Sequence, residues 1–506
     1  MKKNEIAVRT ISGIVISSVI IASAWFGFIH SKYGADPADD DIIPVSDSDS
    51  GTESVTEIDD SLPTEETISK KFVRIAEDTA LRAKSSYNAE TLAMLKSGTE
   101  VLYLDENRDY YFIKYTDETE GWILREKGEV IDKDVVVTHI PKKPSGDPFM
   151  INGTQEGDDL DKILGKYGTV GASVAVIKDG QVAYHYEYGY ANKEDPNNKI
   201  KVTENTKFRI ASISKVFTSM LAMAEVDDGK LNLDGNLSDL FGFSFRNPKY
   251  PNVPVTMRML LTHTAGLSGK EGLYSRYIGV AASSEDYYTY KPGKGYYYSN
   301  LGLGLAGAAV EKAANQTISQ YARDRFFQPM GIDASYDATY LSDKSLVADC
   351  YTNGQHKRSN KALTQPKERK NGKPGEVYSL GQGGLLISAV DLAKVSTILL
   401  NDGIYDGTRY LSHESVEQML TVHPVNTKNK YEQCIGIRKY NSLIGEHNLY
   451  GHTGNYYGIY ALMAIDPEDK SGVIIITSGA HSKREDNTVF TVCNAVMNYC
   501  YSDILS

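Results

Sequence analysis

The distribution of apolar residues divides the chain into segments of different character. Residues 11–29 are almost continuously apolar, and about 19 helical residues span the roughly 30 Å hydrocarbon core of a membrane. Residues 31–70 contain few aromatic side chains and no apolar period, which is typical of a disordered linker. Residues 71–134 carry short apolar runs between turn residues, and these predict a small all-β barrel.

A second linker, residues 135–155, leads to the largest predicted domain, residues 156–506. This domain opens with two alternating runs around Asp179-Gly180, which predict a β-hairpin. Strand-like runs return after residue 457, and the pattern between is mainly helical. Strands at both ends with helices between them predict an α+β fold with one mainly antiparallel sheet and a helical insert.

The N-terminal segment indicates where the remaining domains lie. Residues 1–30 combine the apolar run with a basic flank of Lys2, Lys3 and Arg9, which the positive-inside rule places in the cytoplasm. We therefore expect a single-pass anchor in the cell membrane, with the following domains outside the cytoplasm. A cleaved signal peptide is the alternative because residues 22–24 resemble a cleavage site, although the apolar run continues beyond them.

The net charge of the 506-residue chain is −12, but this charge is concentrated in one segment. Between residues 33 and 69 there are 12 acidic residues and no Lys or Arg, so the rest of the chain is close to neutral. No excess of basic residues remains to form the face that nucleic-acid binding requires. We therefore expect no nucleic-acid partner.

Four cysteines lie in the last third of the chain: Cys350, Cys434, Cys493 and Cys500. Cys493 and Cys500 are expected on one helix about 10 Å apart, which is too far for a disulfide. Cys350 with Cys434 is the candidate pair, and four free thiols packed as small hydrophobic groups are the alternative. No Cys/His spacing typical of a metal site occurs, so we expect neither a metal nor a cofactor.

A serine and a lysine at the start of an apolar helical run are the first candidates for chemistry. Ser212 precedes Lys215 by three residues, which places both side chains on one face of a helix running to about Val226. A hydroxyl is a weak nucleophile until an adjacent base takes its proton. Ser212 and Lys215 are therefore candidate catalytic residues, although such a pair also arises by chance.

A second candidate segment contains Tyr298 and Asn300, in a Pro/Gly-led loop that enters a helix. A tyrosine beside a cationic lysine can have a lowered pKa and serve as a base or proton shuttle. The side-chain amide of Asn300 can hydrogen-bond a substrate carbonyl. Simple packing is the alternative, since the chain has 35 tyrosines.

A third segment, His452-Thr453-Gly454-Asn455, enters a strand near the end of the chain. Gly454 has no side chain, so a substrate backbone could approach closely there. His452 by itself is equally consistent with an ordinary histidine at a strand end.

In this order, Ser212-x-x-Lys215, Tyr298-x-Asn300 and His452-Thr453-Gly454 resemble the penicillin-recognising serine hydrolases, in particular the class C β-lactamase and D-alanyl-D-alanine carboxypeptidase branch. The resemblance implies a β-lactamase/transpeptidase-like fold, with an antiparallel sheet flanked by helices and an all-helical subdomain.

Three other segments resemble the same branch. Residues 170–180 are similar to its opening hairpin, and residues 383–392 to its Gly-Gly-Leu helix entry. Residues 256–267 are similar to its leucine-rich His-Thr-Ser-Gly-Leu segment, with Ala265 in place of Ser. This segment is structural in the family, so we interpret His263 as a core histidine.

The resemblance implies a role for each matched residue. Ser212 would be the acylated nucleophile and Lys215 the base that activates it. Tyr298 would take the proton and return it during acyl transfer. The backbone N–H groups of Ser212 and Asn455 would form the oxyanion hole. Asn300 would hold the substrate amide.

His452 and Thr453 would line the pocket that faces the substrate carboxylate or leaving group. The β-lactamases of this branch carry Lys where this chain has His452. An unperturbed imidazole is mostly neutral at pH 7, so the pocket would hold a carboxylate less firmly. We therefore expect D,D-peptidase, D-aminopeptidase or esterase activity rather than true β-lactamase activity, although β-lactamase activity is not excluded.

Part of the predicted barrel at residues 71–134 also resembles a known family. Residues 80–83, 98–101 and 121–123 are similar to the bacterial SH3-like domains of cell-wall proteins. The resemblance implies docking on peptidoglycan, and a structural spacer is the alternative.

These observations lead us to expect a membrane-anchored extracytoplasmic serine hydrolase that forms an acyl-enzyme at Ser212. The expected activity is D,D-carboxypeptidase-like, on peptidoglycan stem peptides. One alternative is an esterase or D-amino-acid amidohydrolase on small acyl or peptide substrates. Another is a sensor of β-lactams or wall fragments that deacylates too slowly to turn over.

Overall fold

The computed structural model describes residues 63–116, 119–141, 146–268, 290–366, 373–376, 380–485 and 488–506. The expected anchor at residues 11–29 and most of the expected acidic linker lie outside the described residues. Among the residues that are described, no helix has both the length and the apolar character needed to cross a bilayer.

The N-terminal described segment forms a seven-stranded antiparallel sheet in the order β3-β2-β6-β5-β4-β1-β7. Its core contains Val73, Leu81, Ile113 and Ile123, which are fully buried. The small all-β unit expected here is therefore present. Its strands are β1 (Thr64–Ile75), β2 (Thr79–Arg82), β3 (Thr91–Leu95), β4 (Glu100–Glu106), β5 (Tyr110–Thr116), β6 (Thr119–Leu124) and β7 (Gly128–His139).

The boundaries of this sheet differ from the sequence-based ones. Strand β1 begins at Thr64, inside the segment expected to be a disordered linker, and β7 continues to His139, inside the second expected linker. The two strands pair along their whole length, including Ile68 with Val135. Pairing satisfies the backbone groups of both segments, and this long-range partner is invisible in either segment's own composition.

The larger sheet has nine strands, in the order β11-β10-β9-β22-β21-β20-β19-β18, with β8 paired to β10. The predicted hairpin is β9–β10, and its turn residues Asp179 and Gly180 both have positive φ, as a tight two-residue turn requires. The strands are β8 (Phe149–Met150), β9 (Gly171–Lys178), β10 (Gln181–Asn192), β11 (Ile200–Lys201), β18 (Glu432–Gln433), β19 (Arg438–Asn441), β20 (Asn448–Tyr456), β21 (Ile459–Asp466) and β22 (Ser471–Ser478).

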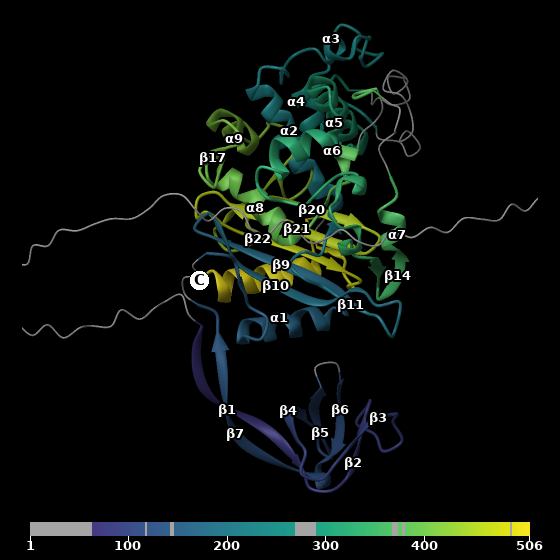
Figure 1. The fold of residues 1–506 in the computed structure, drawn as a ribbon, viewed down its shortest axis with the longest axis vertical. Coiled ribbons are helices and arrows are strands. Elements are labelled where there is room, and N and C mark those ends of the chain that lie inside the picture. Colours follow the sequence, from purple (N-terminus) through teal and green to yellow (C-terminus); the bar gives the residue numbers. More distant parts are fainter. Residues whose placement is uncertain are drawn as a thin grey trace, which may run out of the picture. The chain divides into compact units, whose positions relative to one another are not determined.

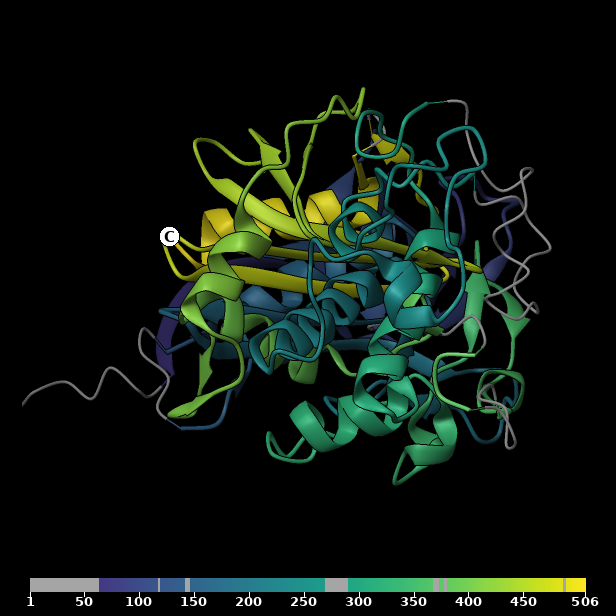
Figure 2. The same cartoon turned by 90° about the horizontal axis from the view of Figure 1, so that it is seen from above.

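Both faces of the central strands are buried, because helices cover each side of the sheet. In β9, Val174 and Val176 join a core shared with α1 (Gln155–Lys166) and α10 (Thr491–Tyr499). The alternate residues of β9 join the core of the helical region and α8 (Ala389–Leu400). Figures 1 and 2 show the yellow C-terminal strands lying beside the blue strands of this sheet, and Figure 1 shows α1 and α8 on opposite sides of it.

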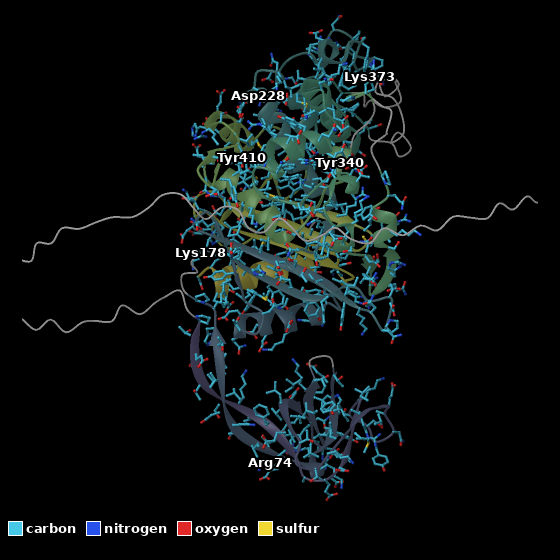
Figure 3. All side chains as sticks on the ribbon, viewed as in Figure 1. Arg74, Lys178, Asp228, Tyr340, Lys373 and Tyr410 are labelled. Atoms are coloured by element: carbon cyan, nitrogen blue, oxygen red, sulfur yellow. The ribbon has the colours of Figure 1, made fainter. Side chains whose placement is uncertain are left out.

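The helical region lies between the N-terminal and C-terminal strands in the sequence, as expected for the predicted α+β fold. Figure 3 shows side chains filling the space between these helices and the sheet, with Asp228 and Tyr410 on the helical side. The helices of this region are α2 (Ser214–Asp227), α3 (Leu237–Phe241), α4 (Met257–Leu261), α5 (Asn300–Ala314), α6 (Ile318–Ala322) and α9 (His413–Leu420). Helix α2 is buried on nearly every side, so its first turn is held rigidly.

All four cysteines are free and buried. The candidate disulfide between Cys350 and Cys434 is therefore not formed, and the alternative of packed thiols is correct. Burial raises the pKa of the Cys350 and Cys434 thiols to about 12. Such thiols are poor nucleophiles near neutral pH.

Candidate active site

Ser212 lies in a short 3-10 turn, Ala211–Ile213, directly before α2. The preceding residue, Ala211, has a φ of 49°, which is unfavourable for a side chain with a Cβ atom. Strained backbone of this kind persists only where the surroundings hold it, and it is common at functional sites. The turn presents Ser212 at the end of a buried helix.

Lys215 supports the Ser212 hydroxyl from the first turn of α2. Its Nζ atom donates to Ser212 Oγ at 3.0 Å and to the backbone carbonyl of Gln382 at 2.6 Å. The side chain is fully buried, and this burial lowers the pKa of the Lys215 amine below its usual value. A lysine with a lowered pKa can act as a base near neutral pH.

Tyr298 approaches Ser212 from the loop before α5. Its hydroxyl donates to Ser212 Oγ at 2.9 Å. The next residue, Ser299, caps α5 by accepting from Gly302 N, which fixes the loop. Burial by itself would raise the pKa of Tyr298, but the charges of Lys215 and Arg438 outweigh it and lower this pKa.

His263 is buried as expected for a core histidine, but it packs against the site. Its ring centroid lies 4.5 Å from that of Tyr298, and its Nδ1 accepts a hydrogen bond from Ser299 N at 3.1 Å. Burial holds the pKa of His263 well below its usual value. His263 is therefore a neutral support for the Tyr298 loop.

Strand β20 carries the third candidate segment past the nucleophile. Its pairing with β19 ends at Gly451, so the following residues pair only with β21 and leave one strand edge open. A substrate in extended conformation can pair with such an edge. A Cβ atom on Gly454 would lie 2.3 Å from the Ile210 carbonyl oxygen. Position 454 therefore requires glycine, because the backbone of the segment that carries Ser212 lies too close for a side chain.

His452 is buried, and its Nδ1 lies 2.7 Å from the Thr453 backbone oxygen. A carbonyl only accepts, so the geometry assigns the proton to Nδ1 and leaves Nε2 as an acceptor. Burial holds the pKa of His452 well below its usual value. The imidazole is therefore neutral.

A cavity of about 350 Å³ opens beside the nucleophile. Among the predicted site residues, Lys215, Asn300 and Gly454 do not line the cavity, although Lys215 donates to Ser212, which does. None of the nine described lining residues is acidic. They are Ser212, Tyr298, Asn429, Tyr431, Arg438, His452, Thr453, Asn455 and Arg484.

Four of these lining residues were not identified from the sequence: Asn429, Tyr431, Arg438 and Arg484. Arg438 is 4% exposed, and its Nε and Nη1 atoms have no hydrogen-bond acceptor among the described residues. Arg484 Nη2 donates to Thr453 Oγ1 at 3.4 Å. No motif marks these isolated residues. Arg438 comes to the cavity through the pairing of β19 with β20, Arg484 lies in β23 (Arg484–Glu485), and Asn429 and Tyr431 lie just before β18.

One group of side chains among the described residues could hold a metal ion by spacing alone. His447, Asp466 and Asp469 have ligand atoms within 4.8 Å of one another. The Nδ1 atom of His447 lies 3.0 Å from Asp466 and 2.9 Å from Asp469, distances that hydrogen bonds explain. None of the three lines the cavity.

Comparison with known proteins places this geometry in a family. The family model described as Beta-lactamase matches residues 156–492, more than half of the chain. Protein flp of Staphylococcus aureus (strain MW2) is 27% identical over 191 residues, which are 36% of this chain and 38% of that protein. The match therefore spans little more than a third of that curated relative.

Two solved structures share the fold of the large domain. D-amino acid amidase from Ochrobactrum anthropi SV3 has a TM-score of 0.54 at 22% identity, covering 69% of this chain and 100% of that one. The beta-lactamase/D-alanine carboxypeptidase of Pseudomonas syringae has a TM-score of 0.53 at 18% identity, covering 69% and 98%. Because the family match includes every element that holds Ser212, Lys215 and Tyr298, the chain belongs to the beta-lactamase family and is a serine hydrolase.

Proposed function

We propose that this serine hydrolase acts as a D,D-carboxypeptidase on peptidoglycan stem peptides at the outer face of the cell membrane. Such a peptide ends in a free carboxylate next to the scissile amide bond. The site therefore needs a nucleophile, an oxyanion hole and a cation at the distance of one residue from the nucleophile.

The observation that carries this proposal is the buried guanidinium of Arg438 in the cavity beside Ser212. The neutral His452 cannot supply a positive charge, but Arg438 stays protonated at every pH of interest. Its unpartnered Nε and Nη1 groups are costly to leave without acceptors. A substrate carboxylate would satisfy them, with the Thr453 hydroxyl and Arg484 beside it.

Acylation would begin when Ser212 Oγ attacks the carbonyl carbon of the scissile amide. The Ser212 proton passes to the Tyr298–Lys215 pair as the C–O bond forms, and the carbonyl electron pair moves to the oxygen. The backbone N–H groups of Ser212 and Asn455 are the proposed donors to that oxyanion. Held donors of this kind typically contribute about 10²–10³ to the rate.

The tetrahedral intermediate would then collapse. Tyr298 returns the proton to the amide nitrogen, the C–N bond breaks, and D-alanine leaves past Arg438. The product is an ester between the substrate acyl group and Ser212. Attack by water on this ester, with the same proton path, releases the acid and regenerates the hydroxyl.

A second candidate activity is hydrolysis of esters or D-amino-acid amides. The observation that favours it is the neutral His452 where the branch's β-lactamases have a cation. The shared fold with a D-amino acid amidase is consistent with it. A sensor that acylates and then stalls would use the same nucleophile.

A steady-state assay separates these activities. The full chain in mild detergent is incubated with diacetyl-Lys-D-Ala-D-Ala, and free D-alanine is measured, with p-nitrophenyl butyrate as a carboxylate-free substrate. We expect catalytic D-alanine release that Ser212→Ala abolishes. Arg438→Gln should lower kcat/KM for the peptide about 10- to 100-fold more than for the ester.

The other outcomes are equally informative. Ester hydrolysis without D-alanine release would refute the carboxypeptidase proposal in favour of the second activity. One equivalent of acylation followed by a stall would identify a sensor.

We also propose that residues 11–29 anchor the chain in the cell membrane with the hydrolase domain outside the cytoplasm. The apolar run and its basic flank support this proposal. Protease added to intact spheroplasts should degrade the hydrolase domain, and deletion of residues 11–29 should release the protein from the membrane fraction. Protection from the protease would contradict this topology.

A further inference from the structure

A buried cation lies against the ring of the proton shuttle. The Arg438 guanidinium carbon is 5.2 Å from the Tyr298 ring centroid and 4.3 Å from that of Tyr431. Alternation along β19 directs Arg438 inward, since Arg438 and Tyr440 are buried while Asn441 is exposed. The position of this charge is therefore determined by the sheet rather than by a loop.

The charged and titratable groups that face Tyr298 come from several elements. Lys215 projects from α2, Arg438 from β19, His452 from β20 and Arg484 from β23, while His263 follows α4. Both histidines are neutral, as shown above. No acidic residue lines the cavity, so nothing described there compensates a positive charge beside the Tyr298 ring.

Lys215 and Arg438 differ in how far their charge depends on pH. The Lys215 amine is itself part of the proton path: it must be uncharged to act as a base, and it becomes charged when it takes the proton. The Arg438 guanidinium keeps its charge throughout.

We propose that Arg438 is a positioning residue that acts through Tyr298, by holding a permanent positive charge beside the ring that favours release of the hydroxyl proton. In this step the Tyr298 O–H bond breaks before substrate attack and its proton is lost to bulk water, and Tyr298 Oη then accepts the proton from Ser212 Oγ. The same proton later goes to the leaving atom of the substrate. Arg438 itself forms and breaks no bond.

Because this proposal rests on the serine chemistry of the proposed function and not on its substrate, a carboxylate-free probe tests it. The rate at which a fluorophosphonate phosphonylates Ser212, with release of fluoride, is measured with the full chain from pH 5 to pH 10. Arg438→Gln should move the acid limb of this profile upward by about 1 to 2 pH units, as expected for loss of a unit charge at about 5 Å.

The direction of this shift does not depend on which group holds the proton. A nearby positive charge lowers the proton affinity of both Tyr298 and Lys215, which titrate as a pair. Removing the charge therefore raises the apparent pKa of the pair, and the acid limb moves to higher pH. A merely structural role would lower the plateau rate without moving the limb.

Matched variants separate charge from packing. Arg438→Lys should leave the acid limb close to its wild-type pH, because lysine keeps the positive charge. Lys439→Gln removes one charge from the neighbouring residue of β19, which does not line the cavity, and should leave the limb within about 0.3 pH units. If Arg438→Gln does not fold, Arg438→Met keeps the apolar stem and is measured instead.

An acid limb in Arg438→Gln or Arg438→Met that coincides with the wild type would overturn the proposal, and Arg438 would then act on the substrate carboxylate alone. Failure of the proposed function would give a different result. The protein would then release no D-alanine, while fluorophosphonate labelling and the shift of its pH profile in Arg438→Gln would still be observed.

Discussion

The backbone carbonyl of Ile210 occupies the space that a side chain on Gly454 would need, because a Cβ atom there would lie 2.3 Å from that oxygen. The segment that carries the nucleophile and the strand proposed to bind substrate are therefore in direct backbone contact. Because the contact joins the Ile210 backbone to a strand inside a sheet, neither segment can move easily to make room for a new atom.

Gly454→Ala should accordingly separate the Ser212 turn from β20. A displacement near 1 Å can cost about 100-fold in rate, so we expect at least that loss in fluorophosphonate acylation. Gly165→Ala is the control, since its Cβ would meet only Tyr188 at an ordinary 3.7 Å. Wild-type acylation in Gly454→Ala would contradict the described contact.

Tyr298→Phe removes the hydroxyl that donates to Ser212 Oγ and keeps the ring packed against His263. If Tyr298 carries the proton, acylation should fall by about two to four orders of magnitude. Stopped-flow labelling measures the rate, and the thermal unfolding midpoint shows that the variant is folded. A loss smaller than about threefold would remove Tyr298 from the mechanism.

Acid should destabilise the hydrolase domain through its buried histidines. Burial holds the pKa values of His263 and His452 well below 6.5. Below about pH 6.5 the unfolded chain binds protons that the folded chain does not, so stability present at neutral pH is lost as the pH falls. Each histidine contributes up to about 1.4 kcal/mol per pH unit.

Urea unfolding between pH 7.5 and pH 5.5 measures this effect. The midpoint of the wild type should fall with pH, and His452→Gln should reduce the slope. His413→Gln is the control, because the Asp402 carboxylate raises the pKa of that exposed histidine, so its removal cannot reduce the slope. An unchanged slope in His452→Gln would show that this imidazole is not kept neutral.

Thiol chemistry tests the assignment of the cysteines. Four free, buried thiols should react slowly with Ellman's reagent in the folded protein, since burial raises the pKa of Cys500 to about 12 as well. In guanidinium chloride all four should react. Only two reactive thiols after unfolding without reductant would indicate a disulfide.

The parts of the fold that the sequence predicted are those with local signals. Asp179-Gly180 predicted the β9–β10 hairpin because a tight turn needs positive φ at adjacent residues. The spacing of Ser212 and Lys215 predicted their contact because helix geometry sets it. Tyr298 was identified only by its order relative to the other motifs.

The parts that escaped prediction depend on distant partners. In the sequence, nothing distinguishes Arg438 from an ordinary surface arginine. Only the pairing of β19 with β20 brings it into the cavity. Strand β1 was missed over residues 64–70 because its partners in β7 lie about seventy residues away in the sequence. The steric need for Gly454 depends on Ile210, which precedes it by more than two hundred residues.

The central claim is that Ser212 is the residue that becomes acylated. Intact-mass and peptide-mapping measurements on the full chain, after incubation with a fluorophosphonate and separately with a fluorescent penicillin, test it most directly. We predict one fluorophosphonate adduct per chain, on the peptide that contains Ser212, and no adduct in Ser212→Ala. Labelling that survives Ser212→Ala, or that maps to another residue, would contradict the account.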